Sequence, residues 1–253
     1  MASDVVIVVD IGKTLSKVTL WSAGGQLRDR QVRQNQVVAV DGIRRLDAAG
    51  IGAWLIEALG KYRGQSVTHI IPVAHGAGVA VIVGDKLAFA PLDYEQAIPD
   101  DVLTAYRAGR DPFPVTGSPA LPDGLNIGSQ LAWAEYLYPD AMEQGLLVPW
   151  AQYWAWFLSG AAVTEVTSLA CHSDLWAPDL GTFSPMAQRA GWAERFAPMA
   201  RAGDTIGTLR PELGAATGLS DKVRVLAGLH DSNAALLASR GFAELARKEV
   251  TTL

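Results

Sequence analysis

The order of hydrophobic and polar positions predicts strands over the first part of the chain. Residues 5–9 are five consecutive aliphatic residues, the pattern of a strand that is covered on both faces. Residues 15–20 alternate between apolar and polar side chains, and residues 27–36 form a more polar alternating stretch. Short turn segments separate these stretches, and the second turn contains Gly24 and Gly25. The pattern predicts a meander of three antiparallel strands.

The following segments predict a helix and further strands. Asp47 is suited to cap a helix whose apolar positions between Ile51 and Leu59 recur with helical spacing. Residues 67–74 are mostly apolar and predict a buried strand, and residues 79–90 predict a hairpin. A doubly wound sheet would not begin with a meander, so we expect an α/β fold of the ribonuclease-H-like type, with a mixed sheet flanked by helices.

The second half of the chain predicts an insertion, aromatic helices and a return to strands. Prolines and glycines dominate residues 109–124, which indicates a loop. Residues 129–138 and 143–158 predict helices rich in tryptophan, a residue that usually forms a core but can also stack on a sugar ring. Residues 223–227 predict a strand that leads into a helix. Residues 250–253 have the composition of a strand, and we expect the sequence to be a portion of a longer protein.

Composition and charge narrow the class of protein. The chain has 253 residues, 49% of them hydrophobic, and a formal net charge of −5, which argues against a nucleic-acid surface. Cys171 is the single cysteine, so an internal disulfide is excluded and a reducing compartment is favoured. No stretch approaches the roughly 20 apolar residues of a membrane span. We expect a soluble, cytoplasmic protein without a nucleic-acid or membrane partner.

The turn after the first strand is a candidate phosphate site. Gly12-Lys13-Thr14 resembles the end of a P-loop motif. The first glycine of that motif would fall at position 7, which is Ile7, and a helix should follow the motif, whereas the pattern here predicts a strand. A strand–turn–strand clamp fits better, because Asp10 could orient a hydrated Mg²⁺ and Gly12 lets the backbone approach a phosphate. The clamp would also use Lys13, Thr14 and Lys17. An ordinary hairpin turn remains the alternative.

Three further residues follow strands. His75 and Asp93 come at strand exits and could hydrogen-bond a polyhydroxylated ligand, although a lone histidine is more often a satisfied core or surface group. Asp231 begins a helix, where it could be only a cap, yet the helix dipole would also keep it ionised as a proton acceptor. His69, His172, His230 and Cys171 lack metal-ligand spacing, which argues against zinc.

These segments in this order resemble the N-terminal half of an FGGY carbohydrate kinase, in the actin/hexokinase/Hsp70-like superfamily. The similar segments are residues 10–17, 75–76, 92–93, 128–133, 157–160, 164–168 and 223–235. The resemblance implies an actin-like ATPase domain at residues 1–222 that binds sugar. It also implies that residues 223–253 are the strand–helix–strand opening of a nucleotide-binding domain whose remainder is absent.

The resemblance also implies roles for the candidate residues. Asp231 falls on the general base, Asp10 on the residue that orients the metal, and His75 on a sugar contact. The resemblance makes Gly12, Lys13, Thr14 and Lys17 phosphate contacts. It makes Asp93 a sugar contact and suggests His172 as a further one. Lys13 stands where the family has threonine or serine, Gln130 replaces a lysine, and no tryptophan precedes Asp93. These departures concern the choice of sugar more than the chemistry.

The sequence therefore predicts an ATP- and Mg²⁺-dependent kinase acting on a sugar or polyol hydroxyl, of which the 253-residue portion alone is expected to be inactive. One alternative is a non-catalytic protein that uses the same domain to bind or sense a sugar. Another is a kinase that acts on a carboxylate or an amino sugar, against which the segment 223–235 and the pair His75-Gly76 argue. A homodimer is a candidate assembly, but the sequence leaves the oligomeric state open.

Overall fold

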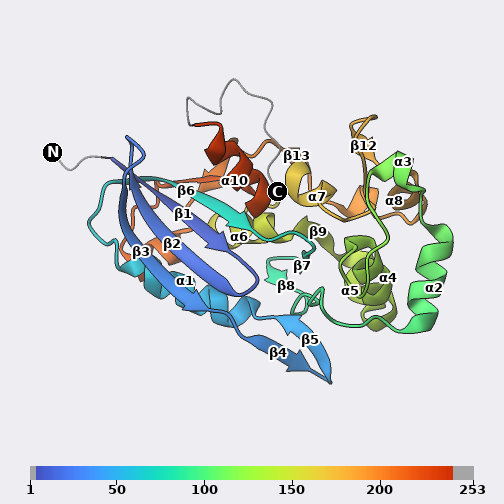
Figure 1. Cartoon of the computed structure of the whole chain (residues 1–253). Helices are drawn as coiled ribbons and strands as arrows, with labels where there is room; N and C mark the ends of the chain where they lie inside the picture. Colours follow the sequence, from blue (N-terminus) through green and yellow to red (C-terminus); the bar gives the residue numbers. More distant parts are fainter. Residues whose placement is uncertain (1–3, 242–253) are drawn as a thin grey trace.

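The computed structural model describes residues 4–241, and a mixed sheet forms its centre (Figure 1). Within these residues the sheet runs in the order β14-β15-β6-β1-β2-β3, and β16 also pairs with β6. Its strands are β1 (Val5–Ile11), β2 (Leu15–Ser22), β3 (Leu27–Gln34), β6 (Val67–Ala74), β14 (Thr205–Thr208), β15 (Arg224–Leu226) and β16 (Leu229–His230). The first three are antiparallel, which confirms the predicted meander, whereas β6 is parallel to β1. The expected α/β fold with a mixed sheet is confirmed.

Helices pack against this sheet and complete the main core. They are α1 (Ala48–Gly60), α6 (Trp150–Ser159) and α9 (Pro211–Thr217). Asp47 caps α1 as predicted, since its carboxylate accepts a hydrogen bond of 2.8 Å from the backbone N–H of Gly50. Trp150 and Trp154 of α6 are fully buried, which supports the interpretation of the tryptophans as core residues.

A second core lies beside the first and belongs to the inserted segments, on the right of Figure 1. Its sheet consists of β8-β7-β9, where β7 spans Val79–Val83, β8 Lys86–Leu87 and β9 Leu146–Pro149. The helices around it are α2 (Asp100–Gly109), α3 (Phe113–Thr116), α4 (Ile127–Leu137), α5 (Pro139–Gln144), α7 (Val166–Ala170) and α8 (Pro185–Arg189). The predicted loop at residues 109–124 thus contains the short helix α3.

One sequence prediction is wrong here, because residues 143–158 are not a continuous helix. Helix α5 ends at Gln144, and residues Leu146–Pro149 form β9, which pairs antiparallel with β7. Gly145 sits so close to Val81 that a side chain would overlap it, and Pro149 cannot donate the backbone hydrogen bond that a helix needs. The apolar pattern of this stretch comes from burial on the second sheet.

The remaining elements of the described residues are short. They are β4 (Val37–Val40), β5 (Ile43–Leu46), β10 (Thr164–Glu165), β11 (Trp176–Ala177), β12 (Thr182–Phe183), β13 (Met199–Ala200) and the 3₁₀ turn η1 (Ala193–Arg195). The predicted domain boundary between residues 222 and 223 stays a prediction. The strands after it, β15 and β16, join the main sheet and lead into α10 (Asp231–Ser239). The strand expected at residues 250–253 lies outside the described residues. In residues 4–241 no helix is both long and apolar enough to cross a membrane.

Candidate functional site

Three neighbouring strands end at the same edge of the main sheet. Strands β1 and β16 are both parallel to β6, and Ile11 and His230 are both in register with Ala74. The next residues along the three strands are Gly12, His75 and Asp231. Parallel strands place their carboxyl ends together, so residues predicted from segments more than 200 positions apart meet here.

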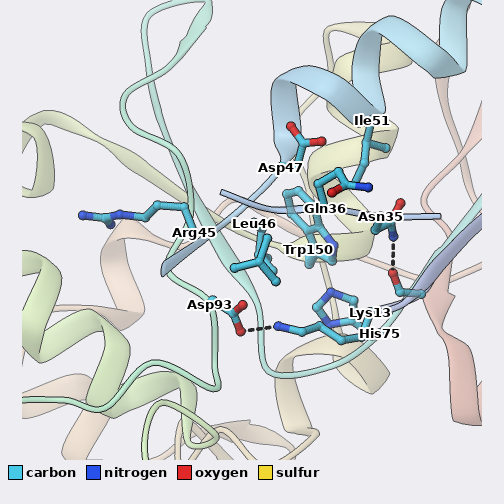
Figure 2. Close-up of a pocket in the computed structure, with 12 residues that line it drawn as sticks. Lys13, Asn35, Gln36, Arg45, Leu46, Asp47, Ile51, His75, Asp93 and Trp150 are labelled. Carbon is cyan, nitrogen blue, oxygen red and sulfur yellow. Dashed lines mark hydrogen bonds and ion pairs between the residues drawn. The ribbon is translucent and has the colours of Figure 1, made fainter. Parts of the chain in front are cut away.

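The candidate phosphate turn between β1 and β2 is tight and internally braced. The N–H of Gly12 donates to the carbonyl of Leu15 at 3.0 Å, and a Cβ on Gly12 would lie 2.8 Å from that oxygen. Asn35 holds the turn from the side, because its Nδ2 donates to the carbonyl of Gly12 at 2.7 Å (Figure 2). Its backbone N–H donates to the carbonyl of Thr14 at 2.9 Å, and it accepts a bond from Ser16 at 2.8 Å. Since a strand follows the turn, the geometry is the predicted strand–turn–strand arrangement.

Asp10 and Lys17 face each other across this turn. They are opposite residues of β1 and β2, and Nζ of Lys17 lies 2.9 Å from Oδ2 of Asp10. The Asp10 side chain is 28% exposed, and within residues 4–241 its Oδ1 has no hydrogen-bond partner. Mg²⁺ in phosphoryl-transfer sites is commonly held by one or two carboxylates, phosphate oxygens and water. One half-exposed carboxylate with a free oxygen fits that need. The described residues contain no group of three or more acidic, histidine or cysteine side chains placed to hold a metal.

Lys13 leaves the turn in another direction. Its ammonium pairs with the carboxylate of Asp93, which lies in the segment after β8 (Figure 2). Nζ of Lys13 is also 4.4 Å from the ring centre of Tyr94 and 3.8 Å from Oε2 of Glu95. Asp93 is only 1% exposed, and Arg44 lies 3.5 Å from its Oδ2. The structure thus brings together two residues that were predicted to act on different parts of the substrates.

His75 is buried at the centre of the strand edge. Its Nδ1 lies 2.6 Å from the carbonyl of Gly76, so the neutral ring carries its proton on Nδ1 and leaves Nε2 as an acceptor. Burial, with a smaller contribution from Lys13, lowers the pKa of His75 to about 4. The hydrogen bond to Gly76 and the charges of Asp231 and Asp93 raise that pKa but do not outweigh burial. The imidazole is therefore neutral at neutral pH.

A small cavity of about 30 Å³ separates His75 from the hairpin β4–β5 (Figure 2). The indole N–H of Trp150 lines it and has no partner within residues 4–241. Lys13, Asn35 and Asp93 also line it. The volume is enough for a water molecule with polar partners.

Asp231 starts α10 on the other side of His75. Its side chain is 37% exposed, and Oδ1 accepts a bond of 2.6 Å from the N–H of Ser232. The Nε2 atom of His230 lies 3.1 Å from the same oxygen. Gly76 separates this histidine from Cys171, because a Cβ at position 76 would be 2.8 Å from both His230 Nε2 and the Cys171 sulfur. Burial, with a contribution from Asp231, raises the pKa of Cys171 to about 11, so the thiol stays protonated.

The structure does not place His172 with the other predicted sugar contacts. It is an exposed loop residue with φ of 50°, beside a second cavity of about 500 Å³. His230, Asn233 and Trp176 line this cavity, whereas His75 and Asp93 line the small one. The two cavities share no lining residue.

Sequence reasoning missed Asn35 and Arg44. Asn35 follows a polar alternating strand, and an asparagine at that position is a usual turn residue, so nothing local marks it as the brace of another turn. Arg44 and Arg45 stand among the apolar residues of the β4–β5 strands, which is the one local sign that this hairpin meets a buried acidic group, Asp93.

Comparison with known proteins places these features in a structural family. A scan of protein-family models finds no match, and a search of the curated proteins finds none either. Among solved structures, a carbohydrate kinase from Novosphingobium aromaticivorans is 62% identical, with a TM-score of 0.96 over 98% of this chain and 53% of that one.

More distant structures share the fold alone. A xylulose kinase from Lactobacillus acidophilus has a TM-score of 0.80 at 14% identity, over 94% of this chain and 50% of that one. A Plasmodium falciparum glycerol kinase with ADP has a TM-score of 0.79 at 11% identity, again over 94% and 50%. The chain spans about half the length of the solved structures that it matches.

Proposed function

We propose, from the premise that this chain belongs to the FGGY family of carbohydrate kinases, that it forms part of an enzyme that phosphorylates a sugar or polyol hydroxyl with ATP. One observation carries the proposal. The in-register ends of β1, β6 and β16 bring a braced phosphate turn, a neutral histidine and the exposed carboxylate of Asp231 to one edge. In-line phosphoryl transfer needs a phosphate site and a proton acceptor at such a shared edge.

Asp231 is the proposed general base. Its carboxylate is exposed at the first turn of α10, where the helix dipole favours the ionised form. The N–H of Ser232 donates to Oδ1, the same oxygen that lies 3.1 Å from Nε2 of His230, so Oδ2 is left to face an acceptor hydroxyl. Asp231 would take the hydroxyl proton as the oxygen attacks the γ-phosphorus.

The phosphate turn is the proposed site for the polyphosphate of ATP. Gly12 and Thr14 would contact phosphate oxygens, because Gly12 allows close approach and the hydroxyl of Thr14 is exposed. Lys17 would balance phosphate charge beside Asp10. Asp10 would hold Mg²⁺ through its free oxygen, and the bound ion would neutralise charge that develops on the phosphates.

The sugar contacts rest on His75 and the Asp93 segment. The unprotonated Nε2 of His75 accepts a hydrogen bond from a substrate hydroxyl, and its low pKa keeps that acceptor available at neutral pH. The predicted contact from His172 would require the ligand to reach the second cavity, which His172 lines together with His230.

A coupled assay of ADP release on the protein with its complete native sequence tests this function. Pentoses, hexoses, deoxysugars, their ketose forms and polyols are offered with ATP and Mg²⁺. We expect turnover with at least one uncharged acceptor, loss of turnover when EDTA removes the metal, and loss of turnover in Asp10→Asn. ATP hydrolysis that no acceptor stimulates would contradict the proposal.

A further inference from the structure

Lys13 is the residue of the phosphate turn whose side chain points towards Asp93, whereas Lys17 points towards Asp10. It is held by the Asp93 carboxylate, the face of the Tyr94 ring and the more distant Glu95 carboxylate. Lys17 remains with Asp10 on the other side of the turn. The two lysines of this turn therefore pair with different carboxylates, Lys13 with Asp93 and Lys17 with Asp10.

Asp93 is a buried anion that needs compensation. It is 1% exposed, and a buried carboxylate is costly unless it is paired and hydrogen-bonded. Besides the Lys13 ammonium, its Oδ1 accepts the backbone N–H of Glu95 at 2.9 Å, and Arg44 lies 3.5 Å from its Oδ2. Arg44 is itself 2.6 Å from Glu95.

The charges of the four residues that pair around Asp93 cancel. Lys13 and Arg44 are cationic, Asp93 and Glu95 are anionic, and His75 is neutral because burial lowers its pKa to about 4. A neutral set of donors and acceptors suits hydroxyl groups, which both donate and accept. A carboxylated acceptor would meet the Asp93 charge where Lys13 and Arg44 are already paired with carboxylates.

Resting on the proposed kinase function, we propose that Lys13 is a specificity-determining residue of the acceptor site, where it neutralises Asp93 and so selects uncharged polyhydroxylated acceptors over sugar acids. The Lys13 ammonium has three N–H groups, so pairing with Asp93 leaves others to donate to a substrate oxygen. Asp93 is held in place beside it by the backbone N–H of Glu95. The prediction that Lys13 contacts phosphate is the competing assignment.

The test separates the two assignments by substrate. In the protein with its complete native sequence, KM for the accepted sugar and KM for MgATP are measured for the wild type and for Lys13→Met. The matched control is Lys222→Met, an exposed lysine just before β15, at the opposite end of the strands. We expect Lys13→Met to raise the sugar KM at least about tenfold and to change the MgATP KM less than about twofold. A tenfold rise in the MgATP KM with an unchanged sugar KM overturns the inference.

A second variant tests the charge argument. Asp93→Asn leaves Lys13 and Arg44 in excess, so we expect the ratio of kcat/KM for the matching sugar acid to kcat/KM for the sugar to rise at least about tenfold. An unchanged ratio contradicts the selection. If Lys13→Met does not fold, Lys13→Met/Asp93→Asn removes both charges together, and the same KM comparison is made on it.

The failure of this inference is distinguishable from the failure of the kinase function. If the wild type binds a sugar by calorimetry but transfers no phosphate, the kinase function fails and the Lys13 effect on sugar affinity still decides the inference. If turnover is present and Lys13→Met affects only MgATP, the kinase function stands and the inference fails. A wild type that binds no sugar overturns both.

Discussion

Gly228 controls how the segment with Asp231 is attached to the main sheet. It lies between β15 and β16 with φ of +75°, a conformation that costs a residue with a side chain about 1–2 kcal/mol. A Cβ at this position would overlap the carbonyl oxygen of Pro72 in β6 and lie 2.9 Å from its carbonyl carbon. Because the obstacle is the backbone of a central strand, relief requires a shift of β16, at a further cost of about 1–3 kcal/mol.

We therefore expect Gly228→Ala to lower the free energy of unfolding by about 3 kcal/mol in total. Gly64 provides the control, since its φ is +80° and nothing lies within 4 Å of an added Cβ. Gly64→Ala should cost only the backbone part, about 1–2 kcal/mol.

Urea unfolding followed by tryptophan fluorescence measures both variants on the protein with its complete native sequence. The urea midpoint of Gly228→Ala should lie below that of Gly64→Ala, and both should lie below that of the wild type. Turnover should fall in this variant alone, because Asp231 is three residues further along. Equal losses of stability in the two variants would refute the close contact between Gly228 and Pro72.

Two further predictions concern buried ionisable groups. Since burial lowers the pKa of His75 from 6.5 to about 4, protonation favours the unfolded chain. Its contribution to stability is complete above pH 6.5 and is lost as the pH falls towards 4, by about 3 kcal/mol. Urea titrations of His75→Gln should show a flatter decline over this range; an equally steep decline would contradict the shift. Arg110 holds the fully buried Asp174 through two bonds of 2.7 Å, and Tyr106 adds a third. Arg110→Met should lower the free energy of unfolding by about 3–5 kcal/mol, and Arg110→Met/Asp174→Asn by clearly less. Equal losses would show that the charge of Asp174 is not the cause.

The sequence predicts local features well where a pattern has one structural meaning. The meander, the Asp47 cap and the strand before His75 all follow from alternation, burial and turn chemistry between near neighbours. The shared edge of Gly12, His75 and Asp231 is also predictable, because consecutive parallel strands end together. The resemblance to a known family rests on the order of these segments and adds the expected roles of their residues.

Other features depend on partners far away in the chain. The strand β9 lies in an apolar stretch that predicts a helix, and it becomes a strand because β7, more than 60 residues earlier, offers it a pairing edge. The direction of Lys13 is set by Asp93, 80 positions later, and the brace of the phosphate turn comes from Asn35. Nothing local distinguishes a lysine that faces phosphate from one that faces a buried carboxylate.

The most direct test of the kinase function is Asp231→Asn in the protein with its complete native sequence. The substitution keeps the shape of the side chain and the bonds that its oxygen accepts but removes the proton acceptor. We predict that the rate of phosphate transfer to the best acceptor falls by about 10²–10⁴-fold, while calorimetric sugar affinity changes by less than about threefold. Transfer within about tenfold of the wild-type rate would contradict the assignment of Asp231 as the base.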